Sequence, residues 1–414
     1  VDYPKLKGFP ADRVIPDDHP IYVYYKWYWK QGDGWNGLNT AVVKGLKSTG
    51  CKDLWTWHDP AVRVASVYGS GGEVDYLSQW TYSYPDPVRI GLATDELLAM
   101  AEPRGAKQQV MKMTQVIWYR SQTAPEPKKP QEALPYKARW EVEQPGAPFI
   151  TIPPMHLREA FWTKMARPIR GIMYHGWQSL VPCQPLGGYR YTHPQTQHEL
   201  ARLVRQVVRP LGPTLLHVPG AKSDVAMLES FASEMFARRG TFGWGGSWAG
   251  DCYHVLQWAH LQPEIIFDET ITGQGLGDFR VLVMPDCDVV TKSMAERIKA
   301  FQGAGGLIVG DERLAPAIKP DIVLPVTTRT GRAKEDKAAL QAVAAQLRKE
   351  LDARYSRCVD STDPDVIPYR RRYKETDYVF VVNDRREYGN YVGQHGRVME
   401  NGLPSDAVVT VRRP

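Results

Sequence analysis

Residues 279–312 read FRVLVMPDCDVVTKSMAERIKAFQGAGGLIVGDE, and this stretch decides the fold of the second half of the chain. The apolar run Val281–Met284 predicts a buried strand. Thr291 can cap a helix over Lys292–Gln302, and the glycines after it end that helix. A second apolar run, Leu307–Val309, follows. A strand, a helix and a strand in this order are typical of an α/β domain with a parallel sheet.

The same alternation continues upstream. Strands are expected at Val225–Leu228 and Glu264–Phe267, and helices at Glu229–Arg239 and Tyr253–Leu261. Short strands separated by helices indicate a small doubly wound sheet. We therefore expect a flavodoxin-like domain over residues 212–335.

Residues 1–211 also alternate strand-like and helical patterns, with Pro and Gly between them. Polar and aromatic residues at strand ends are typical of the mouth of a (β/α)8 barrel. At most six strands are found where such a barrel needs eight, so we expect a partial TIM-type barrel that lacks its first units. The expected strands are Ile21–Trp27, Leu54–Trp57, Tyr76–Trp80, Val110–Tyr119, Arg139–Glu143 and Gly171–Trp177, and the expected helices are Leu38–Leu46, Asp95–Ala101 and His156–Met165.

The last part of the chain, residues 336–414, has a different pattern. Ala338–Tyr355 is rich in good helix formers and predicts a linker helix. Tyr378–Val382 and Val408–Val411 predict strands, which we interpret as the beginning of a β-sandwich.

Composition narrows the classes of function. The net charge is only +6 and the basic clusters are short, as in Arg370–Arg372, so no nucleic-acid partner is expected. No apolar stretch has the length of a membrane helix, so no membrane partner is expected either. The ten His and five Cys are dispersed, and we predict no metal and no cofactor. The compartment is left open, with a secreted or periplasmic location favoured over a cytoplasmic one.

Aromatic content points to a ligand class. The chain has 13 Trp and 21 Tyr but only 10 Phe. Trp and Tyr combine a flat apolar face with a polar atom, which suits the C–H faces and hydroxyl edges of sugar rings. A large protein rich in strands can also hold many aromatics in its core.

Several segments carry a resemblance to a known family. Residues 224–230 (DVAMLES), 256–271 (LQWAHLQPEIIFDETI) and 279–312 resemble, in this order, the amidotransferase-like trimerisation domain of glycoside hydrolase family 42 β-galactosidases. Residues 149–177, ending in GIMYHGW, look like the last helix and eighth strand of the barrel in such enzymes. The resemblance implies hydrolysis of β-linked glycosides by two carboxyl groups, without a cofactor, in a trimer.

The first catalytic candidates lie in residues 139–146, RWEVEQPG. The resembling enzymes carry their nucleophile on the seventh strand in a similar Glu-Gln-Pro-Gly context, which Glu143 matches best and Glu141 next. A surface hairpin explains the same residues. In a competing alignment Val110–Tyr119 is the seventh strand, Thr114 and Gln115 occupy the nucleophile position, and the carboxylate is missing.

The general acid is harder to place, because the family's Asn-Glu dipeptide is absent from this sequence. Asp33 is one substitute, in the segment YYKWYWKQGDGWNG that also contains Trp29 as a sugar-binding candidate. Apolar surroundings would raise the pKa of Asp33, as an acid requires. A Gly-Asp-Gly turn is the alternative interpretation.

A third cluster is LWTWHDPAVR, residues 54–63. We predict that Trp57 stacks on a sugar, that His58 and Arg63 bind its hydroxyls, and that Asp59 binds hydroxyls or acts as catalytic acid or base. The alternative is that Asp59 caps a helix with Pro60 in its first position.

Weaker binding candidates end two other predicted strands. Asp86 follows the aromatic run WTYSYP, and His175 and Trp177 lie in YHGW. Burial of these aromatics in the core is the alternative. The leading hypothesis is a β-galactosidase-like glycoside hydrolase, and the second is a degenerate barrel that binds carbohydrate without catalysis.

Overall fold

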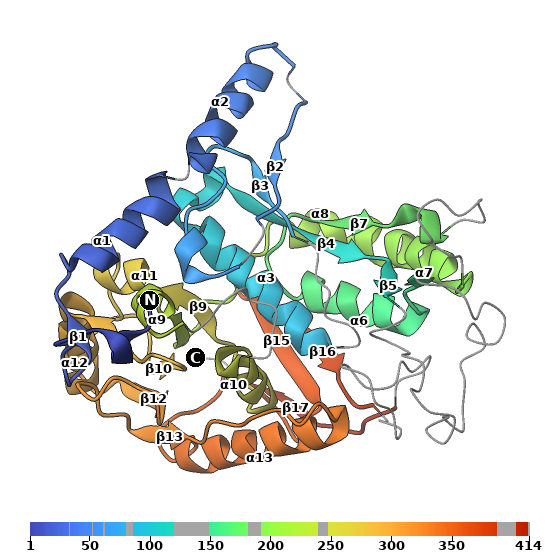
Figure 1. Ribbon diagram of the computed structural model, residues 1–414. Helices are drawn as coiled ribbons and strands as arrows, with labels where there is room; N and C mark the ends of the chain where they lie inside the picture. The colour runs from blue at the N-terminus through green and yellow to red at the C-terminus, as the bar shows by residue number, and fades with distance from the viewer. Residues whose placement is uncertain are drawn as a thin grey trace, which may run out of the picture.

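The computed structural model describes residues 1–32, 34–51, 53–60, 63–79, 86–119, 149–180, 192–238, 247–386 and 403–412. Each half of the chain contains a parallel sheet, and helix α3 lies between the two sheets (Figure 1). This helix spans Pro87–Ala101 and contacts both β4 of the first sheet and β9 of the second.

The second sheet has five parallel strands in the order β9–β8–β10–β12–β13. Counted along the chain this order is 2-1-3-4-5, which is a doubly wound order. Its first strand pairs with the second on one side and with the third on the other. The strands are β8 (Val225–Glu229), β9 (Glu264–Phe267), β10 (Val281–Met284), β12 (Leu307–Asp311) and β13 (Ile322–Leu324).

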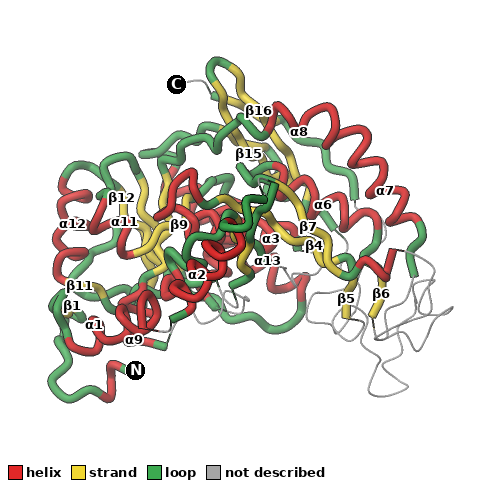
Figure 2. Tube along the Cα trace, turned by 90° about the horizontal axis from the view of Figure 1, so that it is seen from above, coloured by secondary structure: helices red, strands yellow, loops and turns green. Residues whose placement is uncertain are grey.

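Helices cover both faces of this sheet (Figure 2). Val225 and Met227 of β8 pack into one core with α3, α10 (Trp248–Trp258) and α13 (Ala333–Leu351). Ala226 and Leu228 point the other way, into a core with α11 (Asp268–Gly273) and α12 (Lys292–Gly303). Alternate side chains of a strand face opposite sides, so a strand buried on both faces is apolar throughout.

The strands expected in this half are confirmed, with small shifts of their ends. The helix expected at Glu229–Arg239 is α9 (Phe231–Ala237), because Glu229 completes β8 and Ser230 caps the helix by accepting from the amide of Ser233. Strand β13 was not expected.

The first sheet has four parallel strands in the order β2–β3–β4–β7. They are β2 (Trp57–His58), β3 (Tyr76–Leu77), β4 (Gln109–Gln115) and β7 (Gly171–His175). Within the described ranges this sheet is open, so a closed barrel is not formed there. Helices α3 and α6 (Pro154–Met165) pack beside it, and β5 (Ile117–Tyr119) pairs antiparallel with β6 (Phe149–Thr151).

One expected strand, Ile21–Trp27, is wrong. These residues form α1 (Pro20–Trp27), because Pro20 occupies the first helical position and the His19 ring accepts a hydrogen bond from the amide of Ile21. The run of Val, Tyr and Trp favours strands only weakly, and the start signal overrides it.

The next helix, α2 (Trp35–Lys47), projects from the body of the protein (Figure 1). Trp35, Leu38, Val42 and Leu46 are exposed on it. On the inner side, the Asn36 side chain accepts a hydrogen bond from the amide of Gly71. The apolar stripe of α2 therefore faces away from the described protein.

The C-terminal part packs on both halves of the chain instead of standing apart. β15 (Val366–Tyr373) and β16 (Thr376–Asn383) form an antiparallel hairpin, and β14 (Val359–Ser361) pairs with β17 (Val409–Val411). Buried Arg371 of β15 donates to the carbonyls of Met165, Arg167, Leu215 and Val218, at the ends of α6 and α8 (Arg209–Leu215). The described residues therefore form one hairpin and one separate antiparallel pair, and no closed sandwich.

Among the described helices, none has both the length and the apolar character that a membrane span requires.

Candidate functional site

Asp59 directly follows β2, at the carboxyl end of this outer strand of the first sheet. Its side chain is partly buried, and desolvation raises the pKa of Asp59 to about 6, although the charges of Lys112 and Arg63 act to lower it. Burial also lowers the pKa of the neighbouring His58. Asp59 therefore holds a proton at a higher pH than an ordinary aspartate, as a general acid must.

Local contacts position the strand that carries Asp59. β2 pairs with β3, with Trp57 opposite Tyr76. Asp75 accepts hydrogen bonds from the amide of Thr56 at 2.8 Å and from its hydroxyl at 2.9 Å. Around Asp59 the described residues contain no α-helix for it to cap; the nearest helical turn is the 3-10 turn Ala65–Val67.

A buried lysine connects this segment to β4. Lys112 is fully buried and donates to the carbonyl of Gln79 at 2.6 Å, and the Gln79 amide in turn donates to the carbonyl of Pro60. Burial lowers the pKa of Lys112 well below its usual range. Pro60, the residue after Asp59, is therefore held in place by the buried side chains of Gln79 and Lys112.

Arg63, a predicted sugar-binding residue, points into the interior. It is 2% exposed, and its Nε donates to Oε2 of Glu96 at 2.6 Å. Burial raises the pKa of Glu96 to about 7 against the effect of Arg63. Arg63 therefore forms an ion pair in the interior and does not lie at the barrel mouth, where it was expected to bind sugar. The reason is that α3, which carries Glu96, packs between the two sheets.

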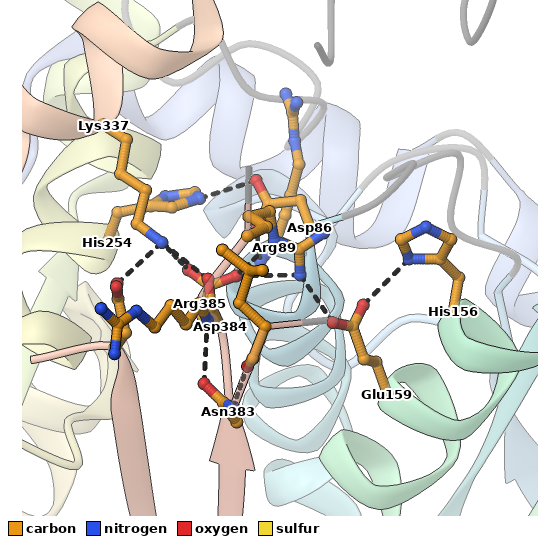
Figure 3. Close-up of polar contacts among 12 residues, drawn as sticks. Asp86, Arg89, His156, Glu159, His254, Lys337, Asn383, Asp384 and Arg385 are labelled. Carbon is orange, nitrogen blue, oxygen red and sulfur yellow. Dashed lines mark hydrogen bonds and ion pairs between the residues drawn. The ribbon is translucent and has the colours of Figure 1, made fainter. Parts of the chain in front are cut away.

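Asp86, predicted to bind substrate, caps α3 and contacts α10 (Figure 3). Its Oδ1 accepts from the amide of Arg89 at 3.0 Å, and its Oδ2 lies 2.9 Å from Nε2 of His254. Nδ1 of His254 lies 2.8 Å from the carbonyl of Gly250, so both ring nitrogens of His254 lie beside an acceptor. Burial acts to raise the pKa of Asp86, but His254 and Arg89 together hold it well below its usual range.

Replacing Asp86 with Ala should lower the free energy of unfolding by roughly 2–4 kcal/mol, from the lost cap and from a buried His254 left without its acceptor. Urea unfolding measures the change. The matched control is Glu335→Ala, in an exposed pair with Arg332, which should cost less than about 1 kcal/mol. Equal losses in the two variants would contradict the structural role of Asp86.

The predicted aromatic and histidine residues divide into two groups. Trp57 is 43% exposed and Trp177 is 57% exposed, and His175 is exposed too, so a ligand can reach them. Trp29 instead packs against the central core. Trp57 lies in β2 and His175 ends β7, so they lie at opposite edges of one sheet.

Asp33, Glu141 and Glu143 lie outside the described residues, and their catalytic roles stay predictions.

The pairing of β4 bears on the competing alignment, in which Val110–Tyr119 is the seventh strand. β4 is the parallel neighbour of β7, with Thr114 opposite Tyr174 and Gln115 opposite His175. If β7 is the eighth strand of a barrel, β4 is the seventh, as that alignment requires.

The side chains at the end of β4 face two directions. Thr114 accepts a hydrogen bond from Lys164 of α6, and burial lowers the pKa of Lys164 to about 7. Gln115 is 4% exposed, and its Oε1 has no partner among the residues that the structure describes. Neither side chain supplies a carboxylate.

Sequence reasoning missed three acids, the buried Glu96 and the partly buried Glu229 and Glu234. They lie together at the carboxyl end of β8, between the two sheets. Glu229 directly follows an apolar strand, which is the one local signal that could have been noticed. The residues after it favour a helix, so the sequence predicts Glu229 as the first residue of that helix.

No metal site is found in the described ranges, where no three His, Cys, Asp or Glu side chains are arranged to hold an ion. Cys287 is fully buried, and burial raises the pKa of its thiol, as in a structural cysteine.

Comparison with known proteins shows similarity at the level of structure. No protein-family model and no curated protein matches the sequence. An α-L-fucosidase isoenzyme from Paenibacillus thiaminolyticus is 10% identical, with a TM-score of 0.50 over 82% of this chain and 59% of its own.

Two β-galactosidases resemble the chain as well. The enzyme from Bacillus circulans sp. alkalophilus is 14% identical, with a TM-score of 0.48 over 81% of this chain and 58% of its own. A GH42 β-galactosidase from G. stearothermophilus is 12% identical, with a TM-score of 0.48 over 76% and 54%. The chain thus spans a little over half the length of these structures, and with the α-L-fucosidase it shares an α/β fold.

Proposed function

We propose that this chain belongs to a glycoside hydrolase that acts on β-linked glycosides, with Asp59 as its acid/base. The observation that carries the proposal is Asp59 itself, a carboxyl group with a pKa raised to about 6 at the carboxyl end of a parallel sheet. Active sites of α/β barrels lie at this end.

The chemistry assigns a role to each neighbour. Protonated Asp59 donates its proton to the glycosidic oxygen as the bond to the anomeric carbon breaks, and the resulting carboxylate can then activate water. Trp57, two residues upstream and exposed, offers its face to the sugar ring. The second carboxylate of the mechanism is assigned to Glu143, with Glu141 next, by the resemblance of residues 139–146.

The shared fold supports the proposal only as an analogy, because one fold can carry many activities. The α-L-fucosidase shows that this arrangement of elements occurs in a carbohydrate-active enzyme. The sugar, the linkage and a trimeric assembly stay predictions from the resemblance. Sedimentation at micromolar concentration tests the assembly.

Replacing Glu143 with Gln should lower kcat on an aryl β-glycoside by about 100-fold or more, because a neutral amide cannot attack the anomeric carbon. Glu141→Gln is the matched comparison and should keep most of the activity. A reversed result would move the nucleophile to Glu141. Full activity in both variants would remove the nucleophile from this segment.

A second candidate function is carbohydrate binding without hydrolysis. The pairing of β4 with β7 favours it, because a seventh strand that ends in Thr114 and Gln115 carries no nucleophile. The two functions differ in a simple experiment. Calorimetric binding of a β-linked oligosaccharide with no release of reducing sugar would support binding alone, whereas turnover would exclude it.

A further inference from the structure

A cavity of about 490 Å³ lies between the end of α10, the helix α13 and the strand pair β14–β17. This volume is within the usual range for sites that bind small molecules. Helices α10 and α13 contact each other beside the second sheet (Figure 1). None of the residues that line the cavity belongs to the candidate active site around Asp59. The polar residues among them include His260, Arg348, Asp360, Ser361, Thr410 and Arg412.

His260 has an unusual backbone conformation. It follows α10 with a φ of 57°, in the left-handed region. Its amide donates to the carbonyl of Gln257 at 2.9 Å, and the amide of Leu261 donates to the carbonyl of Leu256 at 2.9 Å. These two bonds end the helix in a Schellman motif, where glycine is the usual residue because it has no Cβ. A histidine held in this conformation points to a role for its side chain.

The neighbours of the His260 ring determine which nitrogen carries its proton. Asp360 accepts from both terminal nitrogens of Arg348 at 2.9 Å, so it is a carboxylate. Its Oδ1 lies 2.8 Å from Nδ1 of His260, closer than Nη1 of Arg348 at 3.1 Å or the amide of Ser361 at 3.3 Å. Because a carboxylate only accepts, Nδ1 carries the proton. Burial lowers the pKa of His260, so at neutral pH Nε2 is an acceptor.

This acceptor is not satisfied within the described protein. His260 is 4% exposed, and its Nε2 has no hydrogen-bond partner among the residues that the structure describes. A buried acceptor without a donor costs free energy, and folded proteins satisfy nearly all such groups. Since His260 lines the cavity, a hydroxyl group of a ligand there can supply the missing hydrogen bond.

The charges around the cavity favour an anion. Of the charged side chains that line it, Arg348 and Asp360 neutralise each other. Arg412 is exposed and has no ion-pair partner in the part of the chain that the structure describes. The described lining therefore carries one uncompensated positive charge, which an acidic group on a ligand would neutralise.

We propose that this cavity binds a small hydroxylated anion, a sugar that carries one acidic group. A hydroxyl of the sugar donates to Nε2 of His260, and the acidic group pairs with Arg412. Ala344, Ala345 and Val408 line the same cavity and provide apolar surface for the C–H groups of the ring. The proposal does not depend on hydrolase activity, because it uses none of the residues assigned to that reaction.

The test is isothermal titration calorimetry of the full chain with glucuronate, glucose 6-phosphate, glucose and inorganic phosphate. The two acidic sugars should bind at least about tenfold more tightly than glucose, which lacks the anion, and than phosphate, which lacks the sugar hydroxyls. The tighter of the two acidic sugars identifies the acidic group as a carboxylate or a phosphate, and either order supports the proposal.

Two variants connect the binding to this cavity. His260→Asn removes the Nε2 acceptor but keeps an amide that can donate to Asp360, and asparagine tolerates the left-handed backbone. Arg412→Ala removes an exposed cation and should leave the fold intact. Each should weaken the binding of the acidic sugars by about tenfold or more. Arg332→Ala, at an exposed arginine outside the cavity, is the matched control and should bind like the wild type.

Other results would overturn the proposal. Acidic sugars that bind no more tightly than glucose would show that no anion is recognised. An equal affinity for phosphate would remove the hydroxyl contact with Nε2. Unchanged affinity in both His260→Asn and Arg412→Ala would exclude this cavity as the binding site. Asp59→Asn should bind the acidic sugars like the wild type, and a loss of binding there would place them in the candidate active site instead.

Discussion

Replacing Asp59 with Asn is expected to lower kcat on an aryl glycoside by about 100- to 10,000-fold, the usual contribution of a general acid or base. The amide is nearly the same size and keeps the local packing, but it has no proton to donate to the glycosidic oxygen. The measurement is steady-state kinetics with a leaving group that requires protonation. KM should change little, because Trp57 and the other exposed residues remain.

The wild-type pH profile provides an independent check on this role. Since the acid form is required and the pKa of Asp59 is raised to about 6, kcat/KM should fall as the pH rises through about 6. This limb should be absent in Asp59→Asn. The control is Asp53→Asn, an exposed aspartate nearby, which should retain full activity. An active Asp59→Asn variant with the wild-type profile would transfer the role to another acid, and Asp33 is the next candidate.

Replacing Arg167 with Met is expected to lower the free energy of unfolding by about 3–5 kcal/mol. Arg167 lies at the end of α6, is 3% exposed, and binds Asp95 of α3 at 2.7 and 3.1 Å. It also donates to the hydroxyls of Tyr253 in α10 and Tyr369 in β15, and lies 4.2 Å above the Tyr369 ring. The variant leaves the Asp95 carboxylate without its cation where four elements meet.

The matched control for Arg167 is Arg354→Met, which breaks an exposed ion pair with Asp321 and should cost less than about 1 kcal/mol in urea unfolding. Gly91→Ala perturbs the same network from another side, because a Cβ at Gly91 would lie 2.4 Å from Nη2 of Arg167. Gly91→Ala should therefore cost less in the Arg167→Met background than in the wild type. Simple additivity would show that the two residues act separately.

The second half of the fold follows from the sequence because its signals are local and agree with one another. Val281–Met284 and Leu307–Asp311 are apolar throughout, which suits strands buried on both faces, and a capped helix lies between them. The first half lacks such agreement. Its strands β2 and β3 are only two residues long, and Ile21–Trp27 has a strand-like composition behind a helix start signal.

The candidate site divides in the same way. Trp57 and Asp59 could be found from the sequence, because a Trp-rich strand that ends in His-Asp is a local pattern. Asp86 and Arg63 also follow aromatic runs, and the sequence predicts that they bind sugar. In the structure Asp86 instead caps a helix beside His254, and Arg63 pairs with Glu96. These partners lie 168 and 33 residues away, so no local pattern could assign them.

By itself, then, the sequence determined the alternation of strands and helices, the doubly wound second half and the position of Asp59 at a strand end. Only the tertiary structure decided that the first sheet is open in its described part and that β4 lies beside β7. It also decided which acids hold protons. Propensity, capping and apolar runs act over a few residues, whereas the pKa of Asp59 or Glu229 depends on the burial and charges that distant segments bring to it.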